Sequence, residues 1–278
     1  MGDTITQVGR SLLQHGPEND RIYVMKLYEE DTTQVLSAIG DLLRAHHYSK
    51  VFVKARASLA KAFLDNGYEQ EAEIPRFFEG KEDCLFLSKF TTEERRLNKD
   101  RWETAQVLSA AQAKKGVGEP VSLPEGYTCR EADAADAEEM AVLYREVFDS
   151  YPFPIHDPGY IAETMESHVA YWGVWREGTL AALSSSEMDT AGANAEMTDF
   201  ATRPSYRGQG LALYLLQAME EDMGRRGIRT VYTIARAVSY GMNITFSKQG
   251  YTYGGTLVQN THISGSIENM NVWYKHLN

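Results

Sequence analysis

The chain has 278 residues, of which 43% are hydrophobic and 24% are charged, and its formal net charge at pH 7 is −11. This length is sufficient for two domains, and the composition is typical of a soluble globular protein. The negative charge argues against nucleic acid and against an anionic membrane surface as partners, because both would be repelled.

Cysteine usage and hydropathy indicate a cytoplasmic protein without a metal site. The two cysteines, Cys84 and Cys129, are far apart and lack metal-ligand spacing, so we expect free thiols. Residues 1–16 contain no apolar core like that of a signal peptide, and no run of the sequence reaches the length of a membrane span.

Hydrophobic periodicity in the first half predicts strand, helix, strand, helix and two further strands. The expected elements are a strand over 21–27, a helix capped by Asp31 or Thr32, a strand over 50–54, a helix over 57–64, and strands over 74–78 and 83–88.

A polar helical pattern over 93–114 is followed by Gly116-Val117-Gly118-Glu119-Pro120 and then by Pro124. Glycine and proline in this density end regular structure. We therefore place a domain boundary here, which gives domains 1–120 and 121–278.

The second half predicts a longer series of elements. We expect a strand over 127–131, a helix over 135–148, a hairpin of 169–176 and 179–188, a strand over 195–202, a long helix from 211, a strand over 229–235, a helix over 240–249, and an antiparallel pair of 251–260 and 268–276. The segment 151–158 contains three prolines and cannot be regular. It is either a wall of a substrate pocket or a plain connecting loop.

A glycine-rich turn opens the long helix of the second half. Gly208 and Gly210 leave backbone amides accessible at a helix N-terminus, which favours a phosphate, and Arg207 adds a positive charge. The dinucleotide fingerprint is not met, because Leu213 stands where its third glycine would be, and no Gly-Lys-Ser/Thr of a P-loop follows. The pattern favours a pyrophosphate as ligand.

The two halves share an internal similarity. Residues 51–57 match residues 231–237, and each stretch is followed by a short helix closed by Gly-Tyr and by two strands. Where the second half has its glycine-rich turn, the first half has Glu29-Glu30-Asp31, which would repel a pyrophosphate. We interpret the first half as a degenerate copy without cofactor, which packs, dimerises or walls the substrate site; chance similarity of two α/β units is the alternative.

Arg207, Gly210 and Ala212 form an R-x-x-G-x-A pattern between a strand and a helix, which resembles the acetyl-CoA-binding motif of the GNAT N-acetyltransferases. The resemblance covers about residues 121–278. It implies a C-terminal GNAT fold with a mixed α/β sheet, preceded by a smaller degenerate GNAT-like α/β domain, and it implies acetyl-CoA as donor without a metal. The implied cofactor-binding residues are Phe200, Ala201, Thr202, Arg207, Gly208, Gln209, Gly210, Leu211, Ala212, Asn243 and Phe246.

Acetyl transfer to an amine needs a base for the amine and stabilisation of the oxyanion and the departing thiolate. Glu196 is the first candidate for the base and Asp199 the second. Their odd separation places them on opposite faces of a regular strand unless a bulge intervenes. Phe246 stands where the family often has a tyrosine acid, so the general acid stays open.

Over its whole length the chain resembles the β-lysine N-acetyltransferases, notably in residues 151–155, 197–202 and 241–246. The resemblance implies acetyl transfer to the ε-amine of β-lysine, giving N6-acetyl-β-lysine, a compatible solute. The second ammonium of the substrate would then pair with Glu187, Asp189, Glu196 or Asp199, and Tyr151 and His156 would lie near its polar end. A protein or peptide acetyltransferase, a non-catalytic acetyl-CoA sensor, and a homodimer stay open as alternatives.

Overall fold

The computed structural model describes residues 3–116 and 121–277. The first half, residues 3–116, contains β1 (Thr4–Val8), β2 (Ser11–Gly16), β3 (Arg21–Lys26), the 3-10 turn η1 (Glu29–Asp31), α1 (Thr32–His46), β4 (Lys50–Arg56), α2 (Ala57–Leu64), β5 (Glu69–Phe78), β6 (Glu82–Phe90), α3 (Glu93–Arg96) and α4 (Arg101–Gln112).

The second half, residues 121–277, contains β7 (Tyr127–Glu131), η2 (Ala134–Asp136), α5 (Ala137–Val147), α6 (Pro158–Met165), β8 (Val169–Arg176), β9 (Thr179–Asp189), β10 (Asn194–Thr202), η3 (Pro204–Tyr206), α7 (Leu211–Arg225), β11 (Thr230–Arg236), α8 (Tyr240–Lys248), β12 (Thr252–Ile263) and β13 (Ser266–His276).

The predicted strands and helices are confirmed in type and order, with three differences. The hairpin β1–β2 and the short helix α6 were not predicted. The single polar helix expected over 93–114 is two helices, because Leu97 is extended and the carbonyls of Glu94 and Leu97 accept hydrogen bonds from the Gln259 side chain. Most of the predicted break after Gly116 falls on residues 117–120, outside the described residues.

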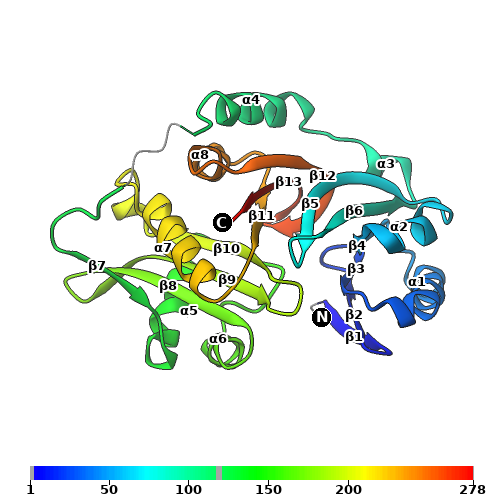
Figure 1. The fold of residues 1–278 in the computed structure, drawn as a ribbon, viewed down its shortest axis with the longest axis horizontal. Helices are drawn as coiled ribbons and strands as arrows, with labels where there is room; N and C mark the ends of the chain where they lie inside the picture. Colours follow the sequence, from blue (N-terminus) through cyan, green and yellow to red (C-terminus); the bar gives the residue numbers. More distant parts are fainter. Residues whose placement is uncertain (1–2, 117–120, 278) are drawn as a thin grey trace.

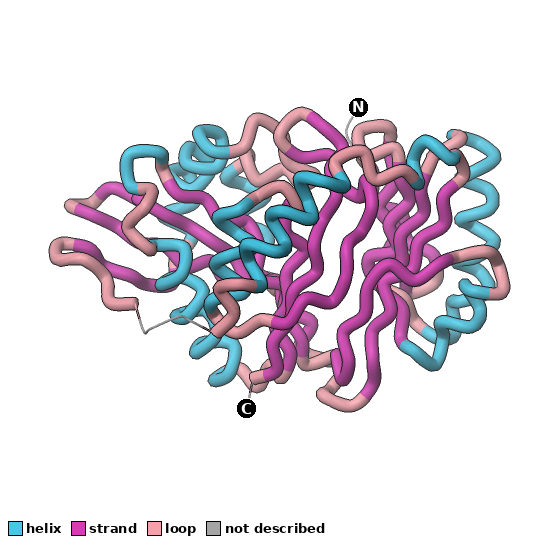
Figure 2. Tube along the Cα trace, turned by 90° about the horizontal axis from the view of Figure 1, so that it is seen from above, coloured by secondary structure: helices cyan, strands magenta, loops and turns pink. Residues whose placement is uncertain are grey.

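All strands of the described residues form one mixed sheet in the order β1-β2-β3-β4-β6-β5-β12-β13-β11-β10-β9-β8-β7 (Figures 1 and 2). The order of the first half, β1-β2-β3-β4-β6-β5, repeats in the second half as β8-β9-β10-β11-β13-β12. Each half has one parallel pair, β3–β4 and β10–β11, and the halves join edge to edge through β5 and β12. The internal repeat is therefore present in the topology, and it also includes the hairpin β1–β2.

Helices cover the sheet on both faces in the second half. Helix α7 buries Leu215 and Met219 against one face, while α5 and α6 bury Leu143 and Ile161 against the other. A separate apolar cluster joins the halves, with Tyr23, Phe52, Phe77, Phe86, Tyr232, Leu257, Met270 and Val272 among its members. This joint core fixes how the two halves face each other.

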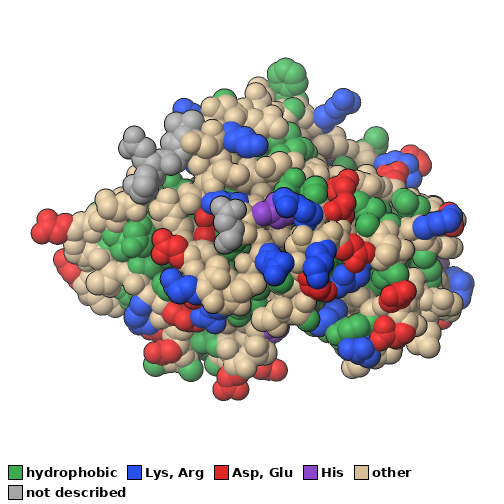
Figure 3. Space-filling view, viewed as in Figure 1, with side chains coloured by type: hydrophobic (Ala, Val, Ile, Leu, Met, Phe, Trp, Pro, Cys, Tyr) green, Lys and Arg blue, Asp and Glu red, His purple; other side chains and the backbone are tan. Residues whose placement is uncertain are grey.

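The two halves also touch through their helices, since α4 of the first half packs against α8 of the second (Figure 1). On the face seen in Figure 3, acidic and basic side chains are interspersed. This face has no continuous basic stripe of the kind that nucleic-acid-binding surfaces carry.

Candidate active site

A cavity of about 1400 Å³ lies where the two halves meet. Its wall includes β3 and β4 of the first half, the segment after α5, and β9, β10, β11 and the start of α7 in the second half. The sequence-predicted residues that line it are Tyr151, Glu187, Glu196, Asp199, Phe200, Thr202, Arg207, Gly208, Gly210, Leu211, Ala212 and Phe246.

Strands β10 and β11 separate inside this cavity. They pair in parallel only up to Glu196 and Tyr232, although β10 continues to Thr202. Beyond this point β10 keeps hydrogen-bonding on its other side, where Ala201 pairs with Leu183 of β9. The β11 side of the last residues of β10 is therefore open to accept an extended ligand as an added strand.

A β-bulge interrupts β10 at the centre of the cavity. The pairing with β9 shifts between Thr198 and Ala201, and Asp199 has a positive φ of 55°. Before the bulge Met197 faces the α7 side, whereas after it Ala201 packs on the α5–α6 side. The bulge thus brings Glu196 and Asp199 into one cavity despite their odd separation.

Of the carboxylates that line the cavity, Glu187, Glu196 and Asp199 act on one another, and we call these three the acidic cluster. Glu187 of β9 and Glu196 of β10 are direct cross-strand partners, so their Cβ atoms are about 5 Å apart. Burial raises the pKa of Glu187, and the charges of Glu196 and Asp199 raise it further. Burial also raises the pKa of Glu196, against an opposing effect of the Lys54 ammonium.

Asp199 is held by two hydroxyl groups. Its carboxylate accepts hydrogen bonds from the Tyr151 hydroxyl and, at 2.5 Å, from Ser185 Oγ. Burial raises the pKa of Asp199, and these two hydrogen bonds oppose the rise. Tyr151 thus belongs to the acidic side of the cavity, where Phe148 and Phe153 continue the wall.

The cofactor turn, residues 207–210, has the geometry of an anion site. Gly208 and Gly210 have φ values of +79° and +77°, which disfavour any other residue. A Cβ at Gly208 would meet no atom within 4 Å, so the backbone there is open to a ligand. Gly210 caps α7, whose first-turn N–H groups lack intrahelical partners. The turn, the open edge of β10 and the cavity together fit acetyl-CoA.

Four sequence-predicted residues do not line the cavity. Ala201 packs into the α5–α6 core, and Gln209 accepts a hydrogen bond from the Tyr127 hydroxyl at 2.7 Å. His156 lies in the segment before α6, where its carbonyl accepts from Arg145. Asn243 is fully buried and uses its amide on the carbonyls of Arg236 and Ser239 and on the side chains of Asn271 and Trp273.

The Asn243 side chain uses both of its polar atoms to tie α8 to β11 and β13. The expected contacts of Ala201, Gln209, Asn243 and His156 with cofactor or substrate stay predictions.

Phe246 lines the cavity and is fully buried in an aromatic group. Its ring contacts Phe200 at a centroid distance of 5.5 Å and Tyr251 at 5.0 Å, both edge to face. The position is therefore part of the apolar packing under the cofactor turn, where a phenylalanine needs no hydrogen-bond partner.

The first half supplies cavity residues that were not predicted. They include Arg21, Tyr23, Phe52, Lys54, Arg56 and Phe77. Register places Tyr23 opposite Phe52 in the pair β3–β4, as Glu196 stands opposite Tyr232 in β10–β11. Tyr23 thus occupies in the first half the place of Glu196. The internal repeat was the one sequence signal that could have indicated this.

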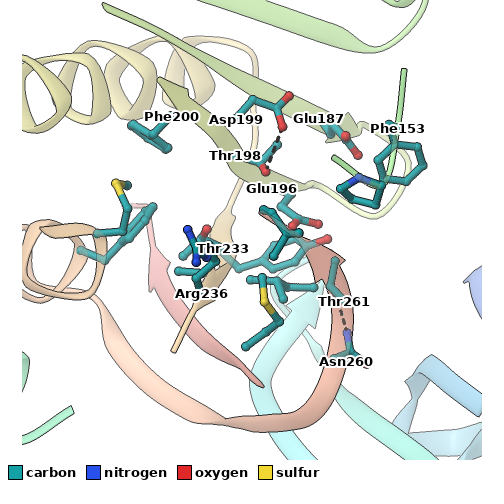
Figure 4. A pocket seen from close by; sticks show the side chains of 18 of the residues that line it. Phe153, Glu187, Glu196, Thr198, Asp199, Phe200, Thr233, Arg236, Asn260 and Thr261 are labelled. Carbon is teal, nitrogen blue, oxygen red and sulfur yellow. Dashed lines mark hydrogen bonds between the residues drawn. The ribbon is translucent and has the colours of Figure 1, made fainter. Parts of the chain in front are cut away.

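Figure 4 shows how the cavity is divided. Asp199, Glu187 and Glu196 project from β9 and β10, with Phe200 toward α7 and Phe153 on the opposite side. Asn260 and Thr261 of β12 lie across the cavity from Asp199.

A family model described as Acetyltransferase (GNAT) family matches residues 138–251. The Beta-lysine N(6)-acetyltransferase of Methanococcus maripaludis is 40% identical over 273 residues, which are 98% of this chain and 98% of that protein. The Beta-lysine N(6)-acetyltransferase of Methanosarcina mazei is 37% identical over 231 residues, 76% of this chain and 85% of that protein. N-acetyltransferase YodP of Bacillus subtilis is 30% identical over 271 residues, 96% of each chain.

Two further features of the described residues concern membranes and metals. Each helix in residues 3–116 and 121–277 is too short or too polar to cross a bilayer. Within the same residues, no three His, Cys, Asp or Glu side chains gather in a way that could hold a metal ion.

Proposed function

The chain belongs to the GNAT family of acetyltransferases, and from this premise we propose that it acetylates the ε-amine of β-lysine. Acetyl-CoA is the donor, and the product is N6-acetyl-β-lysine. The observation that carries the proposal is the acidic cluster: three carboxylates in one cavity closed by both halves of the chain. The substrate has two ammonium groups, which such a cluster accommodates, and identity to two β-lysine acetyltransferases extends over most of the chain.

Acetyl-CoA brings the acetyl group as an activated thioester. The N–H groups at the start of α7, with Arg207, bind the pyrophosphate. The open edge of β10 at Phe200 and Thr202 holds the pantetheine arm as an added strand. A backbone N–H of this segment donates to the acetyl carbonyl and stabilises the charge that develops there.

Glu196 is the general base in this proposal. It lies at the point where β10 and β11 separate, which is where an amine reaching the thioester must pass. Burial raises its pKa and makes it a better proton acceptor than a surface glutamate. Glu196 takes the proton of the ε-ammonium, and the free amine attacks the acetyl group directly in a ternary complex.

Asp199 and Glu187 bind the substrate in this proposal and do not act as the general base. Both Asp199 oxygens accept hydrogen bonds, from Tyr151 and Ser185, so this carboxylate is fixed in place. Glu187 lies beside Glu196 and is available to the second ammonium of the substrate. The thiolate leaves without a side-chain acid at Phe246, since a phenyl ring donates no proton.

The test is acetyl-CoA turnover by the purified protein with β-lysine, α-lysine, simple diamines and a lysine-containing peptide. We expect thiol release with β-lysine at the highest kcat/KM, and mass spectrometry to place the acetyl group on N6. Turnover of the peptide alone would favour a protein acetyltransferase. Acetyl-CoA binding without thiol release from any acceptor would favour a sensor. The chain's cytoplasmic location and a homodimeric state stay predictions.

A further inference from the structure

Four cationic residues of the first half line the acidic cluster's cavity: Arg21, Lys26, Lys54 and Arg56. Of these, Arg21 of β3 and Lys54 of β4 lie over the ring of Tyr23, with Arg21 Cζ 5.1 Å and Lys54 Nζ 5.6 Å from its centroid. Among the described residues, neither cation is part of an ion pair.

The Lys54 ammonium reaches from the first half to the second. Nζ donates a hydrogen bond to the Tyr232 hydroxyl at 2.9 Å. Burial lowers the pKa of Lys54, but the neighbouring Tyr23 and Tyr232 hydroxyl groups and the Glu196 carboxylate raise it well above its usual value. Lys54 is therefore charged at neutral pH. An ammonium has three donors, and the described residues engage one of them.

Arg21 extends the polar surface toward β12. It is 4% exposed, and Nη1 donates to the Asn260 carbonyl and to Thr261 Oγ1. Burial lowers the pKa of Arg21 to about 10, so the guanidinium is also charged at neutral pH. The Asn260 side chain lines the same cavity at 1% exposure, and its Oδ1 has no hydrogen-bond partner among the described residues.

Around the acidic cluster the cavity is thus polarised, with Glu187, Glu196 and Asp199 on β9 and β10 and with Arg21 and Lys54 on β3 and β4. The Glu196 charge acts on Lys54, but neither cation has a direct ion-pair partner among the described residues, and a ligand carboxylate would supply one. We infer that Lys54, assisted by Arg21, binds the carboxylate of the acceptor and makes the enzyme select an amino acid over a plain diamine. This inference rests on the proposed function, because it takes a diamino acid as the acceptor.

The charges of such an acceptor match the polarity of the cavity. β-Lysine carries an ammonium at each of two carbons and one carboxylate. Glu196 receives the reacting ε-amine, Glu187 and Asp199 lie beside the second ammonium, and the carboxylate faces the first half. In this arrangement the degenerate copy keeps a role: it has lost the cofactor turn but supplies the specificity pocket.

The experiment compares β-lysine with 1,4-diaminopentane, which keeps both amines and replaces the carboxylate by hydrogen. The variant is Lys54→Met, with Lys54→Gln as a second variant that can still donate to Tyr232. We expect each to lower kcat/KM for β-lysine about 10- to 100-fold, mainly through KM, since a hydrogen bond to a charged group contributes ~1.5–3 kcal/mol. Turnover of 1,4-diaminopentane should change little, so the preference for β-lysine should collapse.

Lys61→Met is the matched control. Lys61 is an exposed lysine of α2 in the same half, it does not line the cavity, and its ammonium is ion-paired with Asp65 at 2.7 Å. Its substitution should leave the preference for β-lysine intact. Lys54→Arg, which keeps the positive charge, should lose less of the preference than Lys54→Met.

The outcomes separate the two claims. Equal loss with both acceptors in both Lys54 variants, or no loss with either, would overturn the inference while leaving β-lysine acetylation standing. Failure of the wild-type protein to acetylate β-lysine would overturn the proposed function and this inference together. Thermal denaturation of each variant and its KM for acetyl-CoA show whether the fold and the cofactor site are intact.

Discussion

Glu187 and Glu196 stand directly opposite each other on β9 and β10, and both carboxylates face the same buried cavity. Like charges at this separation in a desolvated site disfavour simultaneous ionisation, so the two groups titrate as a pair. This repulsion lowers the stability of the folded protein, whereas the proposed function needs both carboxylates in the cavity.

Glu187→Gln should stabilise the folded protein more at pH 8 than at pH 5. The pKa of Glu187 is raised in the folded state, so its contribution to stability is fully present below the unfolded pKa. That contribution is lost as pH rises toward the folded pKa, and each pH unit between the two pKa values costs ~1.4 kcal/mol. Glutamine does not ionise and avoids this loss.

Thermal denaturation at the two pH values, with Glu221→Gln on the exposed face of α7 as control, measures the difference. Equal stabilisation at both pH values would contradict the raised pKa.

Glu196→Gln and Asp199→Asn should differ in their effect on turnover. Loss of a general base costs about 10²- to 10⁴-fold in rate, and we expect this loss for Glu196→Gln without a comparable change in the KM for acetyl-CoA. Asparagine tolerates the positive φ at position 199, and its amide can accept from one of the Tyr151 and Ser185 hydroxyl groups while its Nδ2 donates to the other. Asp199→Asn should therefore lose about 10-fold, mainly through the KM for the acceptor.

The pH dependence provides a second readout of the same pair of variants. In the wild type, kcat/KM should fall as pH drops through the raised pKa of Glu196, and the same fall should be seen in Asp199→Asn. If the fall at low pH is also seen in Glu196→Gln, another group is the base.

Local signals in the sequence were sufficient for most of the elements, for the repeat and for the glycine turn before α7, but not for the hairpin β1–β2 or for α6. Gly208 and Gly210 were predicted to lie at a phosphate site because a glycine turn before an amphipathic helix is a short-range pattern, and both have positive φ. The acidic cluster was predicted only in part. Whether Glu196 and Asp199 share a face depends on the bulge at Asp199, which residue alternation cannot reveal.

The first half was expected to pack, to dimerise or to wall the substrate site, but which of its residues line the cavity could not be predicted. Lys54 and Tyr23 reach the site only because β5 and β12 join the two sheets edge to edge. That pairing depends on long-range packing and has no local pattern. The hydrogen bonds of Asn243 could not be predicted for a similar reason, since its partners Asn271 and Trp273 lie on a distant strand.

Gly210→Ala should raise the KM for acetyl-CoA about 10-fold with little change in kcat at saturation. The residue has φ +77° directly before the first turn of α7, so a side chain shifts the N–H groups that bind the pyrophosphate. Gly227→Ala is the matched control, because Gly227 has φ +81° and open space, but it follows the other end of α7. Both variants carry a backbone penalty of about 1–2 kcal/mol. An equal rise in KM for both would remove the special role of the cofactor turn.

Gly255→Ala should weaken the junction between the two halves and lower activity with it. Gly255 pairs with Ala72 across β12 and β5, and a Cβ there would collide with the Glu71 carbonyl oxygen. The strands must therefore move apart, which displaces Lys54 and Tyr23 from the cavity.

Gly265→Ala is the control, since Gly265 has φ +85° and a Cβ there would meet no atom within 4 Å. We expect a lower melting temperature for both variants, a larger drop for Gly255→Ala, and loss of β-lysine turnover in Gly255→Ala alone. Full turnover in Gly255→Ala would mean that the first half is dispensable for the acceptor site.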